Sequence, residues 1–448
     1  MAFRILDDEK RRVKMKKTII VLLALMLAAL PVFSTGSSEK AADSGVKTIR
    51  VSWWGGDARH KALLNVIDAF EKANPDVKVE PEYSAFAQYR DKFTIQLTSG
   101  AAPDVMAVDQ PWCDAIVKQG DFFLDLNAYK SELKLDSFDS SMIDNYSIFN
   151  GKTLFLPAGI NGMGSLVDVE MLSKYGFDIS NKDFTWDDLF ELAAKVQADD
   201  PTNYLCCVDS KQAALYYARV YLRQLTGRQL INDDGTMGCS REELAKAFEL
   251  VDRCYKEKVF QPIQESAVYN NTMTQNPTWL DRKMFMILGR TSVMTETASR
   301  RAVDGKPTTT GYVMPQLRGE KETGIEVRPS CLYAINKSTA NPDAAVRFLA
   351  FMLTSKEGAE YIGSNYSVPA REESRAWVSG VLDPSAVENV EYSLANAGSK
   401  LNDWSSNSEV EALFTEIMEK IAYGQYKNML EAADETISRI GMIVSAKN

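Results

Sequence analysis

The chain has 448 residues, of which 45% are hydrophobic and 25% are charged. This length predicts about three domains or two large lobes, and the composition excludes a disordered, collagen-like or polytopic membrane protein. The 61 acidic residues outnumber the 51 basic ones, and a net negative charge disfavours nucleic-acid binding. The chain has one histidine, His60. This excludes zinc clusters built from several histidines and any catalytic triad that does not use His60.

The only long apolar run, residues 19–33, follows three lysines and precedes a short stretch of small and polar residues. This pattern is typical of a secretory signal peptide. The run is shorter than the roughly 20 residues of a membrane-spanning helix, so that alternative is less favoured. We expect a signal peptide over 1–34, a linker over 35–45 and a periplasmic mature protein. No cysteine lies near the cleavage region to carry a lipid anchor.

Strands and helices alternate at the start of the mature chain. Strands are predicted over 47–53, 77–83 and 104–109, and helices over 60–72 and around 88–98. Alternation at such short spacings predicts right-handed crossovers and a parallel sheet with helices on both faces. The first lobe is therefore expected to be α/β.

The rest of the chain is richer in helix signals. Thr185 and Asp188 form a capping-box pattern that opens a helix to residue 196. Asn341-Pro342 opens a helix through 353, another helix begins at 354–357, and an apolar stripe over 410–421 predicts a late helix. The six cysteines lack metal-binding spacing, so we expect buried thiols, while their disulfide state stays open.

The motifs of common enzymes are incomplete. Gly151-Lys152-Thr153 resembles the end of a phosphate-binding loop, but position 146, where the loop needs glycine, is a tyrosine. Gly162 and Gly164 lack the third glycine of a dinucleotide-binding motif, and there is no Gly-x-Ser-x-Gly sequence. We therefore expect no enzymatic activity, no cofactor and no metal.

Six short motifs occur in the order found in a known family. They are residues 70–75 with 77–80, 98–105, 155–157, 184–189, 341–349 and 354–358. With these motifs the chain resembles extracellular solute-binding protein family 1, the sugar-binding, maltose-binding-like branch that serves bacterial ABC importers. The resemblance implies two α/β lobes, a ligand cleft between them and a hinge. It places the first lobe at 46–158 plus 316–366 and a helix-rich second lobe at 159–315 plus 367–448.

A sugar-binding site combines flat aromatic rings with polar side chains that bond hydroxyl groups. In an open parallel sheet such residues belong beyond the carboxyl ends of the strands. The candidates that follow the first three predicted strands are Trp54, Asp57, Arg59, Glu82, Tyr83, Asp109, Gln110 and Trp112. Trp53 and Trp54 point to opposite sides of a continuing strand, and we favour Trp54 as the ligand contact.

Five further candidates lie later in the chain. Asn161 follows the hinge that the resemblance places at 157–159, and a structural role in a turn explains it equally well. Trp279 and Trp404 lie in polar loop contexts, where a large ring needs a cover that either a ligand or the protein can provide. Arg290 and Arg328 carry forked guanidinium groups suited to a carboxylate or to neighbouring hydroxyls, and a structural ion pair is an alternative for both.

The leading hypothesis is a periplasmic protein that captures a carbohydrate and delivers it to the permease of an ABC transporter. We expect it to act as a monomer and without nucleic acid. One alternative is a non-sugar solute such as a polyamine, paired with Asp57, Glu82 and Asp109. A less favoured alternative is an exported carbohydrate-active enzyme that uses two carboxylates.

Overall fold

The computed structural model describes residues 45–270, 272–292, 301–303 and 306–447. The predicted signal peptide lies outside the described residues, as does the predicted linker except for Gly45. The described residues from Lys47 onward form one compact unit. Within the described part of the chain, no helix is both long and apolar enough to cross a membrane.

The first sheet has six strands in the order β14-β6-β13-β3-β1-β2. Their bounds are β1 Lys47–Trp54, β2 Val77–Ser84, β3 Val105–Val108, β6 Leu156–Asn161, β13 Arg328–Ile335 and β14 Val368–Pro369. The parallel pairing of β1 with β2 and β3 confirms the prediction for these strands. No strand was predicted from the sequence over 328–335, and this strand, β13, enters between β3 and β6 and is antiparallel to both.

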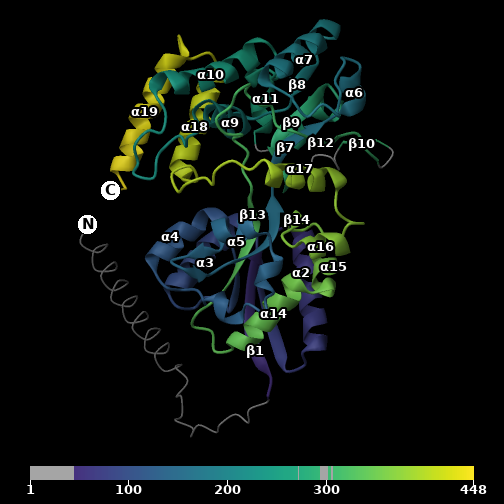
Figure 1. Cartoon of the computed structure of the whole chain (residues 1–448), viewed down its shortest axis with the longest axis vertical. Helices are drawn as coiled ribbons and strands as arrows, with labels where there is room; N and C mark the ends of the chain where they lie inside the picture. The colour runs from purple at the N-terminus through teal and green to yellow at the C-terminus, as the bar shows by residue number, and fades with distance from the viewer. Residues whose placement is uncertain (1–44, 271, 293–300, 304–305, 448) are drawn as a thin grey trace, which may run out of the picture. The chain divides into compact units, whose positions relative to one another are not determined.

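Helices cover this sheet from distant parts of the chain. They are α2 Asp57–Ala73, α3 Phe86–Thr98, α4 Cys113–Gln119, α5 Ser140–Tyr146, α14 Pro342–Thr354, α15 Lys356–Ile362 and α16 Glu372–Trp377. The helix predicted over 60–72 is α2, and it buries an apolar face on which Leu63, Val66 and Phe70 are each at most 2% exposed. Figure 1 shows α2 (purple) next to α14 and α15 (green), and both of these helices contact α2.

The second sheet has four strands in the order β12-β7-β9-β8. They are β7 Met163–Val167, β8 Tyr204–Cys206, β9 Met284–Arg290 and β12 Thr310–Tyr312. The helices in this part are α6 Val169–Ser173, α7 Trp186–Asp199, α9 Arg219–Thr226, α10 Arg241–Lys256, α17 Pro384–Ala395, α18 Ser408–Ala422 and α19 Met429–Ser445. The capping box of α7 is confirmed, since Thr185 Oγ1 accepts from the Asp188 amide at 3.2 Å and Asp188 Oδ2 accepts from the Thr185 amide at 2.8 Å.

Short elements complete the fold. They are η1 Gln110–Trp112, η2 Leu126–Tyr129, η3 Leu135–Ser137, β4 Ile148–Phe149, β5 Lys152–Thr153, α8 Ser210–Gln212, the π-helical η4 Ala213–Ala218, α11 Ile263–Ser266, η5 Ala267–Tyr269, η6 Met273–Gln275, α12 Pro277–Leu280, β10 Ala302–Val303 and β11 Lys306–Pro307. All six cysteines lie in the described part of the chain, where they are buried and unpaired.

Two large hydrophobic cores accompany the two sheets. One contains Val51 and Phe155 of the first sheet region, and the other contains Val167 and Phe248 of the second. The chain passes from β6 to β7 through the single residue Gly162. A Cβ at this position would lie 2.5 Å from Ser393 Oγ, so the close approach of α17 requires glycine there. The division into lobes at residues 158, 315 and 366 stays a prediction.

Candidate functional site

A pocket of about 70 Å³, which we call the cleft pocket, has walls from both sheet regions. Gln110 follows β3 of the first sheet, and Tyr146 ends α5. Arg290 ends β9 of the second sheet, and Arg219 begins α9. The rest of the lining is made of residues 326–328 and 397–401 together with Pro111, Ser141, Met142, Asn145, Ser406 and Glu411. The pocket therefore lies where the ends of strands from both sheets meet.

Glu326 organises the charges of the cleft pocket. It is 5% exposed, accepts from Arg290 Nη2, and lies 2.5 Å from Arg219 Nη2. Burial alone would raise the pKa of Glu326, but the positive charges of Arg219 and Arg290 outweigh it and lower the pKa to about 2. Glu326 is therefore ionised at neutral pH and holds two guanidinium groups in place.

Arg328 lines the pocket, and Asp109 directly precedes the lining residue Gln110. Arg328 has no ion pair with any described residue, and burial together with the nearby charge of Arg290 lowers its pKa. Burial raises the pKa of Asp109, while the positive charge of Arg328 opposes that rise. The two side chains thus interact electrostatically without the short contact of a salt bridge.

Several N–H groups in this region have no hydrogen-bond partner among the described residues. They include Arg290 Nη1, Arg219 Nε and Arg328 Nε. A buried donor without a partner costs about 1–3 kcal/mol. The cleft pocket therefore has donor groups ready for an acceptor.

A larger space, which we call the outer hollow, adjoins the cleft pocket and measures about 800 Å³. The two spaces share Ser399, Lys400 and Leu401 in their linings. Trp404 lines the outer hollow from one side, and Lys118 of α4 lines it from the other. Lys118 Nζ lies 2.5 Å from Asp403 Oδ2, so an exposed ion pair joins the two sides.

The family model described as bacterial extracellular solute-binding protein matches residues 56–359, more than half of the chain. The chain belongs to this family. The resemblance stated from the sequence motifs is thereby confirmed, and the family consists of binding proteins rather than enzymes.

Solved structures share the fold of this solute-binding protein. A periplasmic solute-binding protein of Pectobacterium atrosepticum is 25% identical, with a TM-score of 0.79, and the match covers 90% of this chain and 99% of that one. A periplasmic oligogalacturonide-binding protein of Yersinia enterocolitica, in complex with saturated digalacturonic acid, is 24% identical. Its TM-score is 0.77 and the coverage is 89% and 99%. The α/β two-lobed periplasmic-binding-protein fold is therefore confirmed.

A Brucella abortus protein that carries the name of a binding protein is 25% identical over 240 residues. The match covers 53% of this chain and 56% of the relative, so the chain spans about half the length of this curated relative.

The structure brings together part of the predicted site of this solute-binding protein. Gln110, Arg290 and Arg328 line the cleft pocket, and Asp109 directly precedes Gln110. Trp404 is partly buried and lines the outer hollow. These five residues are the candidates that lie in or next to the two spaces, and their contact with a ligand stays a prediction.

Trp54 and Trp112 lie in an aromatic cluster at the end of β1 instead of lining either space. They are 8% and 9% exposed, their ring centroids are 5.7 Å apart, and Phe86 packs on both. Trp53 is fully buried and stacks on Tyr83 at 5.0 Å. The two neighbouring tryptophans therefore do point to different surroundings, as the strand pattern predicts.

The other candidates after β1 and β2 do not line the cleft pocket, and two of them have polar protein partners elsewhere. Arg59 donates to the carbonyl oxygens of Asn365 and Trp54. Glu82 accepts from Arg50, Lys92 and Gln96. The remaining two are Asp57, in the first turn of α2, and Tyr83, which is 45% exposed.

Two later candidates are enclosed by the protein. Asn161 is 6% exposed at the end of β6, and its Oδ1 accepts from the Ser292 amide at 3.1 Å. Trp279 is fully buried, and the guanidinium of Arg301 lies 4.1 Å from its ring centroid. Neither residue lines the cleft pocket or the outer hollow.

Of the residues that line the cleft pocket, the sequence interpretation proposed only Gln110, Arg290 and Arg328. Those that it missed include Tyr146, Arg219, Glu326 and Lys400. A signal for Arg219 exists, because it stands within the largely apolar stretch 213–222 and must find a partner if that stretch is buried. The structure adds a second sign, which the sequence does not show: the preceding segment η4 is π-helical, and π-helical turns are frequent at functional sites. No pattern pairs Arg219 with Glu326, more than a hundred residues away.

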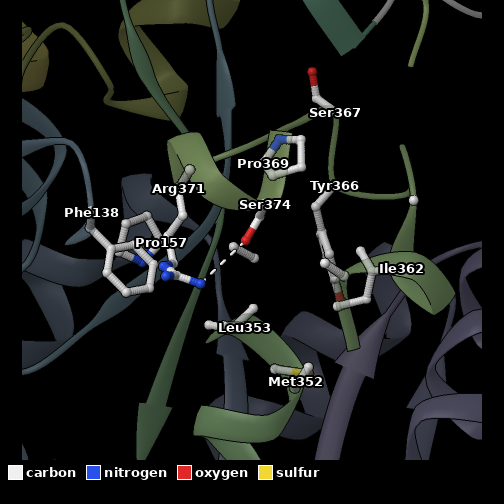
Figure 2. A pocket seen from close by; sticks show the side chains of 14 residues that line it. Phe138, Pro157, Met352, Leu353, Ile362, Tyr366, Ser367, Pro369, Arg371 and Ser374 are labelled. Carbon is white, nitrogen blue, oxygen red and sulfur yellow. Dashed lines mark hydrogen bonds between the residues drawn. The ribbon is translucent and has the colours of Figure 1, made fainter. Parts of the chain in front are cut away.

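A second cavity, of about 20 Å³, lies within the first sheet region, and Figure 2 shows it. Arg371 reaches into it, donating from Nε to Ser137 Oγ at 2.7 Å and from Nη1 to the Thr354 carbonyl at 3.1 Å. The space holds about one water molecule. This cavity is therefore too small for a sugar. Elsewhere in the described residues, no group of three or more side chains is arranged to bind a metal ion.

Proposed function

We propose that this protein captures a carbohydrate in the cleft pocket and outer hollow and delivers it to the permease of an ABC importer. The observation that carries the proposal is a pair of spaces that share the lining segment 399–401, one lined by Gln110, Arg290 and Arg328 and the other by Trp404. Tryptophan offers a flat face for a sugar ring, and the polar side chains offer partners for its hydroxyl groups. The Yersinia neighbour, which binds an oligogalacturonide, supports the carbohydrate class.

The two adjoining spaces suit different parts of one ligand. Small-molecule sites commonly measure about 300–1,000 Å³. The cleft pocket alone, at about 70 Å³, is too small for a sugar ring, whereas the outer hollow is large enough for more than one. We therefore place the ring or rings against Trp404, with one polar substituent directed toward the arginines.

Walls from both sheet regions also give a basis for transport. A ligand that contacts Gln110 and Arg290 at once stabilises the closed arrangement of the two lobes over an open one. A permease that recognises the closed arrangement would then distinguish loaded protein from empty protein. We propose that this occurs in the periplasm with a monomeric binding protein.

The charges disfavour a polyamine. Asp57, Glu82 and Asp109 do not line one space, and Glu82 already accepts from Arg50 and Lys92. The cleft pocket is rich in arginine, which would repel a polycation. The family consists of binding proteins, which disfavours the carbohydrate-active enzyme.

The test is a thermal-shift panel on purified protein stripped of carried ligand by unfolding and refolding. The panel contains neutral mono- and oligosaccharides, uronic acids including digalacturonic acid, polyamines and amino acids. A ligand at 100 times its Kd stabilises the folded state by about 2.7 kcal/mol, which gives a clear shift in Tm. A response only to polyamines or amino acids would contradict the proposal.

A pair of tryptophan variants locates the site. Trp404→Ala should weaken binding of the sugar found in the panel at least tenfold, about 1.4 kcal/mol. Trp377→Ala is the matched control, because Trp377 is also partly buried but packs near Arg371 in the first sheet region. Equal affinities for both variants and the parent protein would show that the outer hollow is not the site.

Delivery to the permease requires a cellular measurement. Cells that lack this protein should lose uptake of the identified sugar and regain it when the protein is restored. Restoration by the Trp404→Ala variant should need a higher concentration of sugar.

A further inference from the structure

The charge of the cleft pocket is opposite in sign to that of the whole chain. The chain has a net charge of −10. The charged side chains that line the pocket are four basic and two acidic, namely Arg219, Arg290, Arg328, Lys400, Glu326 and Glu411. Even when neighbouring Asp109 is counted, an excess of positive charge remains. Buried charge without a partner is costly, so this excess needs a physical reason.

The arginines are held in place by ion pairs, but some of their N–H groups have no hydrogen-bond partner among the described residues. Glu326 accepts from Arg290 and pairs with Arg219, so one carboxylate holds two guanidinium groups. Arg290 is 8% exposed and Arg219 is 5% exposed. Arg290 Nη1 and Arg219 Nε nevertheless have no partner among the described residues. Two well-held groups thus have donors left over for an acceptor.

Arg328 adds a guanidinium that no described residue pairs with directly. It is partly buried, its Nε has no partner among the described residues, and it lines the same pocket as Arg290. A planar guanidinium donates two parallel hydrogen bonds to a carboxylate, and this geometry is stronger and more specific than a bond to a hydroxyl. Arg328 is therefore the residue best placed to bind an anionic group.

We propose that the captured solute carries a carboxylate, as a uronic acid does, and that Arg328 and Arg290 bind this carboxylate in the cleft pocket. The proposal rests on the proposed function, because it assigns the acidic group to a sugar held in the same site. The sugar ring would occupy the outer hollow, and the carboxylate would neutralise the excess charge of the pocket. Lys400, whose Nζ lies 5.3 Å from the Tyr146 ring centroid, extends the positive surface toward the outer hollow.

A neutral sugar fits this environment less well. Hydroxyl groups can accept hydrogen bonds from arginine, but they leave the positive charge uncompensated in a buried pocket. The attraction between opposite charges is stronger in such an environment than in water. The charge, rather than the shape of the ring, should therefore decide affinity.

The decisive experiment compares each acidic sugar with its own methyl ester by isothermal titration calorimetry on the full protein. The probes are mono- and disaccharides of galacturonic and glucuronic acid, their methyl esters, and the corresponding neutral and sulfated sugars. The acid should bind at least tenfold more tightly than the ester. The ester keeps the ring and the carbonyl but loses the charge and gains a methyl group, and the neutral sugars control for the bulk of that group.

Three arginine variants assign the effect to residues. Arg328→Gln should remove most of the preference for the acid while circular dichroism shows an unchanged fold, because Arg328 has no ion pair with a described residue. Arg290→Lys keeps the positive charge beside Glu326 but removes the planar guanidinium that donates two parallel hydrogen bonds. It should reduce the preference for the acid over the ester by a smaller factor than Arg328→Gln does. Arg347→Gln is the matched control: Arg347 pairs with Asp76 on the surface, and its side chain is 40% exposed.

The outcomes separate the two proposals. Equal or tighter binding of the esters, the neutral sugars or the sulfated sugars would overturn the carboxylate inference and leave carbohydrate capture standing. A preference for the acid that survives in Arg328→Gln and Arg290→Lys would overturn the assignment to these arginines. Absence of binding by every carbohydrate would overturn the proposed function and the inference with it.

Discussion

The cleft pocket and the small cavity of Figure 2 are both lined by buried arginine, but the arginines differ in how many of their nitrogens have a hydrogen-bond partner. In the small cavity, Arg371 is 1% exposed and all three of its nitrogens donate, to Ser137, to Thr354 and Ser374, and to Glu373. In the cleft pocket, Arg290 Nη1 and Arg219 Nε have no partner among the described residues.

This difference separates two roles for a buried charge. A guanidinium with a complete set of partners holds segments of the chain together and has nothing left to offer a ligand. A guanidinium that is held on one side and free on the other presents donors at a fixed place. Burial alone therefore does not distinguish a structural arginine from a binding one. Donors without a partner indicate a binding role only where the arginine also lines a pocket, because Arg223 and Arg301 have such donors but line neither the cleft pocket nor the outer hollow.

The largest effect should follow the loss of the shared carboxylate in the cleft pocket. Glu326→Gln leaves Arg219 and Arg290 buried side by side without their counter-charge, and should lower the free energy of unfolding by about 3–5 kcal/mol. Urea unfolding at pH 7 measures this change. A loss below about 1 kcal/mol would show that the arginines do not depend on Glu326.

The pH dependence of that effect follows from the pKa of Glu326. The folded-state pKa of about 2 lies below the usual 4.5, so the folded protein binds fewer protons than the unfolded chain between these values. The stabilisation is complete above pH 4.5 and is lost as the pH falls toward 2, by roughly 3 kcal/mol. The stability difference between parent and Glu326→Gln should therefore shrink in acid, as urea unfolding from pH 6 to pH 3 would show. A constant difference would contradict the lowered pKa.

A smaller loss should follow substitution in the cavity of Figure 2. Arg371→Gln removes hydrogen bonds to Ser137 and Thr354, and should lower the free energy of unfolding by about 2–3 kcal/mol. Affinity for the solute should stay unchanged, because this cavity does not border the cleft pocket. Urea unfolding measures the loss of stability, and calorimetry measures the affinity of the same variant. A tenfold loss of affinity would show that Arg371 does not have a purely structural role.

The smallest effect concerns the exposed ion pair of the outer hollow. The side chains of Lys118 and Asp403 are 72% and 49% exposed, and such pairs contribute about 0.2–1 kcal/mol. Lys118→Met should therefore change affinity by less than about fivefold, and 0.5 M salt should reduce even this difference. A larger and salt-independent loss would show that Lys118 contacts the solute.

The local elements of the fold were predictable because their signals are local. The apolar face of α2 and the capping box of α7 lie within single helices. The antiparallel strand β13 was not predictable in the same way, because its neighbours in the sheet are β3 and β6, which lie far earlier in the chain. The sequence places strands along the chain, but only long-range packing orders them in a sheet.

The same limit explains which of the predicted site residues lie close together in the structure. The candidates were placed after each of the first three strands, but β2 is at the far edge of the sheet and β3 is next to β13. Gln110 follows β3 and reaches the cleft pocket, whereas Glu82 and Tyr83 lie on β2, at the opposite edge of the sheet. The pairing of Arg219 with Glu326 crosses from a helix to a distant strand segment, so no spacing rule could reveal it.

The place of β13 in the sheet has a consequence for how the protein folds. When synthesis has reached β6, the first sheet still lacks the strand that will separate β6 from β3, and two strand edges stay open until residues 328–335 follow. Open edges invite pairing with other chains, and distant pairings form slowly. We expect folding to be late and cooperative, and refolding from denaturant to be slower and more prone to aggregation than for a protein of equal size with sequentially added strands.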